Sequence, residues 1–198
     1  MLKKLLVISA LIALSFTLAF AQGSQTAVQA PAVKLVLLIS EQNIDSHRQA
    51  WWASEVDLSA AEAAIATRLL DAGFEIIEPG SMSNVISQDK AFRVVNLSDK
   101  TSIKMASLAK ADYVIVGKAV ASAGGNVPQS TMRSCFANLT AKLINVKTGK
   151  IIAYLDAAGN SAHMDVISGG REALASAGQN IAAKIVDKLN TILKAKQQ

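Results

Sequence analysis

Cysteine is almost missing from this chain of 198 residues, and the single one, Cys135, has no partner for an intrachain disulfide. The fold must therefore be held by a packed core, which a domain of this size can supply. Cys135 alternates with apolar residues in a predicted strand, so we expect it to pack as a small apolar side chain. A reactive thiol is the alternative, and rapid modification in the folded protein would reveal it.

Residues and motifs that mark catalytic or metal sites are also scarce. The two histidines, His47 and His163, show neither the His-x-x-x-His nor the His-Glu-x-x-His spacing of zinc sites. Glycine loops that hold phosphate and the G-x-S-x-G motif of hydrolases are missing. The stretch from Ser168 to Arg171 can bind an anion at a helix start, although capping alone explains it. We therefore predict no enzymatic activity, no metal and no cofactor.

The excess of positive charge is small and spread along the chain. The formal net charge of +5 includes Lys3 and Lys4 at the N-terminus, and the other basic residues form no long run. This pattern argues against nucleic acid as a partner.

The N-terminus has the layout of a cleavable export signal. Lys3 and Lys4 precede an apolar run from Leu5 to Phe16, which is too short for a membrane span. No cysteine follows this run, so we expect no lipid anchor. We predict a protein of the periplasm, or of the outside of the cell, with a signal peptide over 1–21, a disordered leader over 22–32 and a single α/β domain over 33–198.

Apolar patterns predict one mixed α/β sheet: a parallel β-α-β start, then an antiparallel meander of three strands, flanked by helices. A capping box of Ser59 and Glu62 begins the first helix, and Gly149 suits a hairpin turn. Ser168 is predicted to cap a long C-terminal helix, and the turn-rich stretch 122–134 is predicted to be an exposed, mobile loop. The remaining predicted elements are strands 33–39, 74–78, 112–120, 135–143 and 151–158, a short helix over 81–88 and a helix beginning at Ser98.

Three stretches resemble a set of cell-envelope proteins. They are "ADYVIVGKAV" (111–120), "NLTAKLINVKTGKIIA" (138–153) and the amphipathic final helix. Together they resemble the α/β domain shared by the curli-secretion protein CsgG, the penicillin-binding-protein activator LpoB, the N-terminal domain of TolB and the middle domain of the flagellar assembly protein FlgT. The resemblance implies a non-catalytic module that acts through protein–protein contacts in envelope, flagellar or other surface-apparatus assembly.

Two departures from this set bear on the comparison. CsgG-like and LpoB-like proteins are lipoproteins, whereas this chain has no cysteine directly after its apolar run. It also has no alternating insertions long enough for a pore of the curli type. The comparison with FlgT and TolB therefore fits better, and it brings no catalytic residues with it.

The segment from Ser40 to Asp57 follows the carboxyl end of the first strand, where open α/β sheets commonly bind ligands. Adjacent tryptophans offer flat surfaces with indole donors, and a neighbouring histidine and arginine can orient a carboxylate. In the alternative interpretation, one tryptophan covers the sheet edge and the other covers a helix. We predict that a protein partner binds here through Glu41, His47, Arg48, Trp51 and Trp52.

A second class of function uses the same segment differently. A periplasmic hydrolase or small-ligand-binding protein could combine the loop over 40–57 with His163, and close approach of His47 and His163 would favour that class. Self-association through the final helix or the meander is a further expectation. The sequence names neither the partner nor the oligomeric state.

Overall fold

The computed structural model describes residues 33–44, 49–50, 59–77 and 98–197, and residues 32–198 make up one compact unit. The predicted signal peptide (1–21), leader (22–32) and short helix (81–88) lie outside the described residues. The elements, in chain order, are β1 (Lys34–Gln42), β2 (Gln49–Ala50), α2 (Ala60–Asp71), β3 (Glu75–Ile77), α4 (Asp99–Leu108), β4 (Tyr113–Asn126), β5 (Arg133–Asn145), β6 (Ile151–His163) and α5 (Val166–Gln197).

These elements form one mixed sheet. The strands β1, β4, β5 and β6 lie side by side in that order, while β2 and β3 both pair with β1. The pairs β1–β3 and β1–β4 are parallel, and β4, β5 and β6 form an antiparallel meander. The predicted fold class, with its parallel β-α-β start and long C-terminal helix, is thus confirmed.

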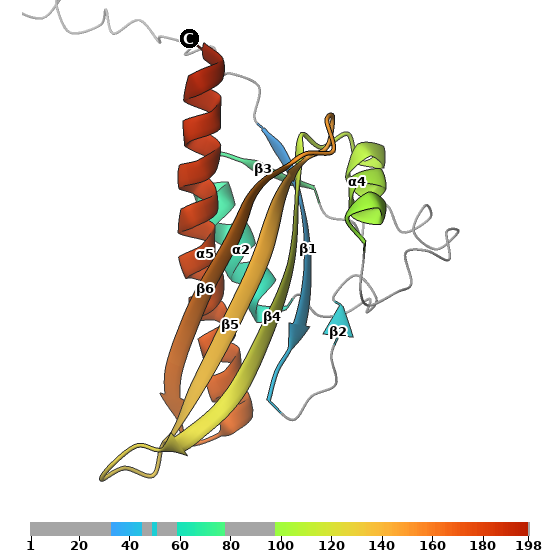
Figure 1. Cartoon of the computed structure of the whole chain (residues 1–198). Helices are drawn as coiled ribbons and strands as arrows, with labels where there is room; N and C mark the ends of the chain where they lie inside the picture. Colours follow the sequence, from blue (N-terminus) through green and yellow to red (C-terminus); the bar gives the residue numbers. More distant parts are fainter. Residues whose placement is uncertain (1–32, 45–48, 51–58, 78–97, 198) are drawn as a thin grey trace, which may run out of the picture. The chain divides into compact units, whose positions relative to one another are not determined.

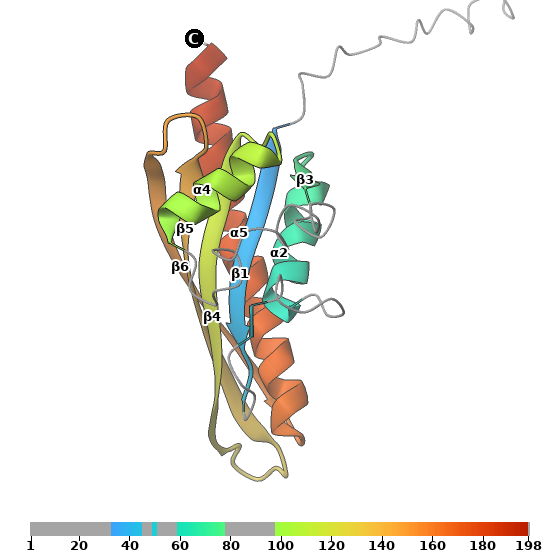
Figure 2. The ribbon, with the colours of Figure 1, turned by 90° about the vertical axis from the view of Figure 1, so that its right-hand side faces the viewer.

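Helices cover the two faces of the sheet unequally (Figures 1 and 2). Because β1 is apolar on both parities, it contributes to two cores. Leu35, Leu37 and Ile39 pack in the larger core with α2 and α5. Val36 and Leu38 pack in a smaller core with α4 on the other face. A strand buried on both faces is the structure that a continuous aliphatic run predicts.

The meander is longer than the turn-forming residues suggest. β4 continues to Asn126, and Ala123 still pairs with Cys135, so the predicted loop over 122–134 is reduced to residues 127–132. The prediction was wrong because pairing resumes at Asn126, opposite Arg133, after an irregularity of the ladder at Gly124 and Gly125. The ring of Phe136 on β5 lies where a side chain on Gly124 would be, which explains an exposed aromatic residue at this place.

Short-range capping sets the helix starts. The Oγ atom of Ser59 accepts from the Glu62 N–H group, which confirms the predicted start of α2. The long helix begins earlier than predicted, at Val166. The carboxylate of Asp165, not Ser168, caps it by accepting from the N–H groups of Ile167 (3.4 Å) and Ser168 (2.8 Å). No helix within the described ranges is long and apolar enough to cross a membrane.

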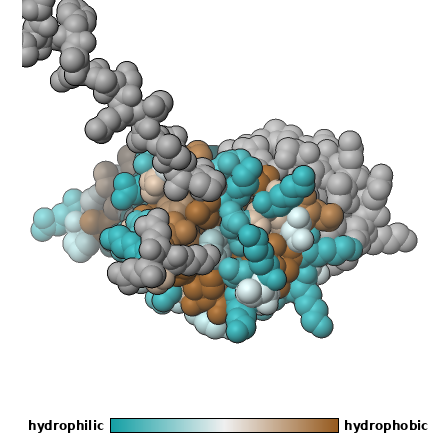
Figure 3. Space-filling model, turned by 90° about the horizontal axis from the view of Figure 1, so that it is seen from above, coloured by the Kyte–Doolittle hydropathy of each residue, from teal (hydrophilic) through white to brown (hydrophobic). Residues whose placement is uncertain are grey.

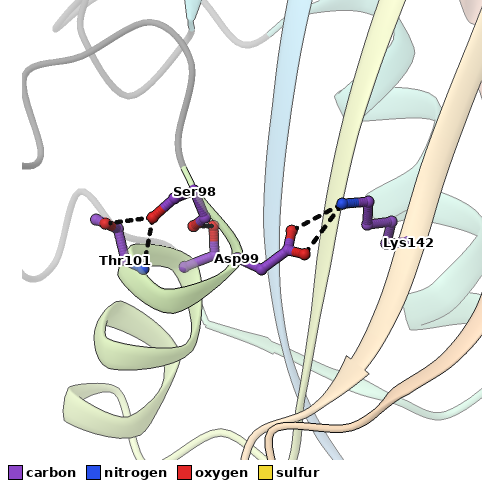
Figure 4. Close-up of polar contacts among 5 residues, drawn as sticks. Ser98, Asp99, Thr101 and Lys142 are labelled. Carbon is purple, nitrogen blue, oxygen red and sulfur yellow. Dashed lines mark hydrogen bonds and ion pairs between the residues drawn. The ribbon is translucent and has the colours of Figure 1, made fainter.

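The α4 helix is fixed to the sheet at its first turn (Figure 4). Ser98 caps the helix by accepting from the Thr101 N–H group at 3.3 Å. The next residue, Asp99, accepts from Lys142 of β5 through both carboxylate oxygens at 3.0 Å. This ion pair connects α4, which covers the smaller core, to β5, the central strand of the meander.

Candidate partner-binding site

Glu41 is the one predicted binding residue that the structure describes. It stands near the end of β1, half-buried, and its Oε2 atom accepts from the Ala61 N–H group of α2 at 2.9 Å. A carboxylate at a helix start is favourable because it meets both unpaired N–H groups and the positive end of the helix dipole. Glu41 therefore has a structural role at the beginning of α2. The other predicted residues, His47, Arg48, Trp51 and Trp52, lie outside the described residues.

Asn43 fixes the chain just after β1 to the start of α5. Its Nδ2 group donates to the carbonyl of Ile167 at 3.0 Å, and its Oδ1 atom accepts from the Ile44 N–H group at 2.8 Å. A side chain on Gly170 would collide with the Asn43 amide, so the strand end and the helix approach closely here. This contact joins two segments that are 124 positions apart in the sequence.

The chain returns to β1 directly after this anchor. In β2, Gln49 pairs with Glu41 and Ala50 pairs with Ser40. Both neighbours of the segment 45–48 are thus fixed at the carboxyl end of β1, which is where ligands commonly bind in open α/β sheets.

His163 has a local role at the start of α5. Its Nδ1 atom accepts from the Asp165 N–H group at 3.0 Å. The side-chain and backbone hydrogen bonds from Ser168 hold the pKa of the Asp165 carboxyl below its ordinary value. Because Asp165 already occupies the N–H groups at this helix start, the arrangement does not support anion binding by the stretch from Ser168 to Arg171.

The structure bears on three alternatives from the sequence: a metal site, a pair of histidines and a reactive cysteine. Within the described ranges, no three His, Cys, Asp or Glu side chains come close enough together to hold a metal ion. His47 lies outside the described residues, so the close approach to His163 that would favour a hydrolase is not tested. Cys135 is fully buried, with its Sγ atom 3.8 Å from the carbonyl oxygen of Val166, which confirms the prediction that it packs in the core.

Three large apolar side chains are exposed at the end of the molecule toward which β1 runs, five residues of β5 beyond the level of its last pair. Met132, Met164 and Ile167 are 42%, 69% and 52% exposed. Arg133 and His163 form the last pair of β5 and β6, so both methionines stand just beyond the paired strands. Ile167 lies in the first turn of α5, where Asn43 is anchored. We call these three residues the distal apolar surface. The turn that joins β4 to β5 lies at the lower end of the molecule in Figure 1.

No local pattern in the sequence predicts the distal apolar surface. Met132 lies among turn-forming residues, and Met164 and Ile167 lie on either side of a charged residue, so no local apolar pattern marks them. Only the pairing of β5 with β6 and the anchoring of α5 bring them to one end. Flexible, polarisable methionine side chains at such places are typical of surfaces that bind other proteins.

One groove lies elsewhere, between the end of α2 and the middle of α5. It has a volume of about 200 Å³, and it is lined by Arg68, Asp71, Ala72, Ala183, Val186 and Asp187. Small-molecule sites are commonly larger, about 300 Å³ or more, and more apolar. Glu41, the predicted site residue that the structure describes, is not among the residues that line this groove.

Comparison with known proteins gives similar structures only. No protein-family model and no curated protein matches the sequence. A hypothetical protein from Chlamydia trachomatis is 13% identical, with a TM-score of 0.47 over 80% of this chain and 95% of that one. The LpoB C-terminal domain from Salmonella enterica is 21% identical, with a TM-score of 0.42 over 67% and 85%. A lipoprotein from Neisseria meningitidis is 15% identical, with a TM-score of 0.41 over 83% and 99%.

LpoB is one of the four proteins that the sequence resembles, and its domain is among these structures. The TM-scores lie below 0.5, so the likenesses assign no role to this chain.

Proposed function

We propose that this chain is an exported protein of the bacterial envelope that binds another protein and catalyses no reaction. The observation that carries the proposal is the position of the distal apolar surface. It lies at the end of the sheet where Glu41 and Asn43 anchor the chain leading into Trp51 and Trp52. The signal-like N-terminus supports export. Assembly of a flagellar or other surface apparatus is our narrower proposal, and it rests on the resemblance.

A protein partner suits this end better than a small substrate. The described polar groups here are engaged in holding the fold: Glu41 caps α2, Asp165 caps α5 and the Nδ1 atom of His163 accepts from the backbone. Beside these engaged groups, large apolar side chains are exposed at strand ends and at a helix start. Exposed apolar residues on a rigid support are typical of protein interfaces, whereas small ligands need a concave pocket.

The anchors also prepare the site for binding. The hydrogen bond from Asn43 to Ile167 and the contact of Glu41 with α2 connect β1 to both helices of the larger core. Binding to a surface that is already ordered loses less conformational entropy than binding to one that must first be ordered. We therefore propose that the fold serves as a rigid support, presenting its partner-binding residues at one end.

In-cell cross-linking tests this proposal. A photoreactive residue is placed at position 52, 164 or 167, and at the exposed position 188 of α5 as a control. We expect positions 164 and 167 and position 52 to give one adduct of the same mass, and position 188 to give none. Different adducts from the three test positions, or the same adduct from the control, would contradict a defined binding end.

A pair of substitutions separates binding from folding. Trp51→Ala together with Trp52→Ala is expected to abolish the adduct from position 164 while the circular dichroism spectrum and thermal midpoint stay unchanged. If the protein instead loses its cooperative unfolding transition, the tryptophans are packing residues and their assignment to the binding site is wrong. Met164→Ser, a change at an exposed position, then tests the distal apolar surface without altering the core.

A further inference from the structure

A second distinctive surface lies at the opposite end of the sheet. There the turn between β5 and β6 lies close to α4. A Cβ atom added at Gly149 of the turn would be 3.8 Å from the Cδ1 atom of Ile103 in α4. The turn is also fixed to the start of β4, since the Val146 N–H group donates to the carbonyl of Asp112 at 3.0 Å. Three elements that are separate in the sequence therefore form one continuous surface.

Lysines gather on this surface. Lys100 and Lys104 are exposed one turn apart on α4, Lys110 follows the end of that helix, and Lys147 and Lys150 are exposed in the β5–β6 turn. We call the surface that these five lysines occupy the basic end. Along the sequence they span 51 positions, counted from 100 to 150, which is why the charge seems scattered there.

At Lys100, Lys110, Lys147 and Lys150, little of the positive charge is neutralised by the described acidic residues. Asp99 is paired with Lys142, and Asp112 is 3.9 Å from Lys147, which is itself 81% exposed. Lys100, Lys110 and Lys150 form no ion pair with any residue in the described ranges. The basic end thus presents a positive potential to solvent, which attracts anionic partners over about 10 Å at moderate ionic strength.

Apolar side chains are exposed among the lysines. Leu108, the last residue of α4, is 50% exposed, and Ile151, the first residue of β6, is 36% exposed. Figure 3 looks onto this end of the molecule, where hydrophobic groups (brown) lie between projecting hydrophilic ones (teal). Lysines around exposed aliphatic residues are the composition of surfaces that bind in the headgroup region of a membrane.

The first strand begins at the same end. The Asp112 N–H group donates to the carbonyl of Lys34 at 2.8 Å, and the backbone N–H of Lys34 donates to the Asp112 carboxylate at 3.1 Å. Residues 1–32, which contain the apolar run of the export signal, are therefore joined to the domain beside the basic end.

We propose that the basic end docks on an anionic phospholipid surface. The lysines supply attraction to the headgroups, and Leu108 and Ile151 enter the layer beneath them. An acidic protein would use the lysines but would give no reason for aliphatic residues to be exposed between them. Nucleic acid is disfavoured for the same reason. The membrane that an exported chain crosses offers the anionic surface.

Vesicle binding tests the proposal. The chain is recovered after export, its N-terminus is determined by mass spectrometry, and it is mixed with vesicles of phosphatidylcholine alone or of phosphatidylcholine with phosphatidylglycerol. We expect co-sedimentation with the anionic vesicles, weakening as salt is added, and much weaker binding to the neutral ones. Each lysine near an anionic surface contributes roughly a fivefold gain in affinity.

Matched variants identify the surface. Lys100→Gln, Lys110→Gln and Lys150→Gln together are expected to lower the affinity for anionic vesicles by about 100-fold, three lysines being removed. Lys118→Gln, Arg133→Gln and Arg171→Gln change the net charge equally at other places and are expected to have little effect. Leu108→Gln is expected to weaken binding while keeping its dependence on salt.

Two results would overturn the proposal. One is failure of the wild-type chain to bind anionic vesicles at low salt, which would leave an acidic protein as the partner of the basic end. The other is an equal loss of vesicle binding in the two triple variants. That result would show that binding depends on net charge alone and that the basic end is not the binding surface. Circular dichroism of each variant checks that the fold is kept; five of the six substituted positions are exposed, and Lys118 is half-buried.

Discussion

At the residue scale, glycines show how closely the long helix packs. A Cβ atom on Gly178 of α5 would lie 2.5 Å from the carbonyl oxygen of Ala61 and 3.0 Å from the Cβ atom of Ala64, both in α2. A Cβ atom on Gly159 of β6 would likewise collide with the backbone of α5 at Ala173. The helix is therefore pressed against both its helical neighbour and the sheet, and backbone cannot move aside as a flexible side chain can.

We expect Gly178→Val to lower the free energy of unfolding by about 3 kcal/mol, the upper end of the usual range for overpacking. The physical reason is that backbone atoms, not a mobile side chain, occupy the space. Urea unfolding followed by circular dichroism measures the change as a shift of the midpoint. Gly125→Val is the control, because nothing lies within 4 Å of its Cβ position, and it should change the midpoint little. Equal effects of the two substitutions would refute close packing of α2 on α5.

At the element scale, α5 does more than cover the core. Lys184 donates from Nζ to the carbonyl of Asp156 at 2.6 Å, and Asn180 donates from Nδ2 to the carbonyl of Ala158 at 2.8 Å. Both carbonyls belong to β6, the last strand of the sheet. Unpaired carbonyls on an edge strand invite pairing with another chain, and polar side chains that occupy them reduce that tendency. The helix thus protects the edge of the meander along which it runs.

The start of α5 gives a prediction that depends on pH. The pKa of Asp165 is lowered by the hydrogen bonds from Ser168, so the folded state binds a proton there less readily than the unfolded state. A group with a lowered pKa contributes its stability above the ordinary pKa, 3.8 for this carboxyl, and loses it as the pH falls through the folded value. We expect Asp165→Ala to be less stable than wild type at neutral pH, with the difference shrinking in acid.

Chemical unfolding of both proteins over a series of pH values measures this difference. Asp165→Asn serves as the comparison, because an asparagine side chain also caps helices but carries no titrating charge. It should lose less stability than the alanine variant at neutral pH. A difference between wild type and Asp165→Ala that stays constant from neutral pH down to strongly acidic pH would show that the ionised carboxylate is not what stabilises the helix start.

Elements that depend on local sequence patterns could be predicted, whereas those that depend on pairing between distant segments could not. The aliphatic run of β1, the alternation of β5 and the cap at Ser59 each depend on near neighbours, and each was predicted correctly. The continuation of β4 past Gly124 and Gly125 was not predicted. The pairing of Asn126 with Arg133 beyond these glycines outweighs their local preference for turns. The cap of α5 was misplaced by one turn because Asp165 and Ser168 are both good capping residues, and only the path from β6 into the helix selects the first.

At the scale of the whole molecule, the residues of both proposed surfaces come together only through the fold. Met132 and Met164 meet at the end of the meander, and lysines from α4 and the β5–β6 turn meet at the other end. No sequence pattern links positions so far apart. The two surfaces are separated by the length of β5, whose 13 residues at about 3.3 Å each span roughly 40 Å. A chain that docks through its basic end can thus hold a second protein at a distance from the membrane.

This arrangement predicts that the two surfaces act independently. Substitutions that are far apart and share no contacts usually have additive effects. We therefore expect Trp51→Ala with Trp52→Ala to leave the affinity for anionic vesicles within about twofold of wild type. This factor corresponds to the roughly 0.4 kcal/mol by which the effects of distant substitutions commonly deviate from additivity. Co-sedimentation at several salt concentrations measures it. Tryptophan also prefers the interfacial region of membranes, so loss of vesicle binding in this variant would place the tryptophans on the lipid surface and show that the two ends do not have separate roles.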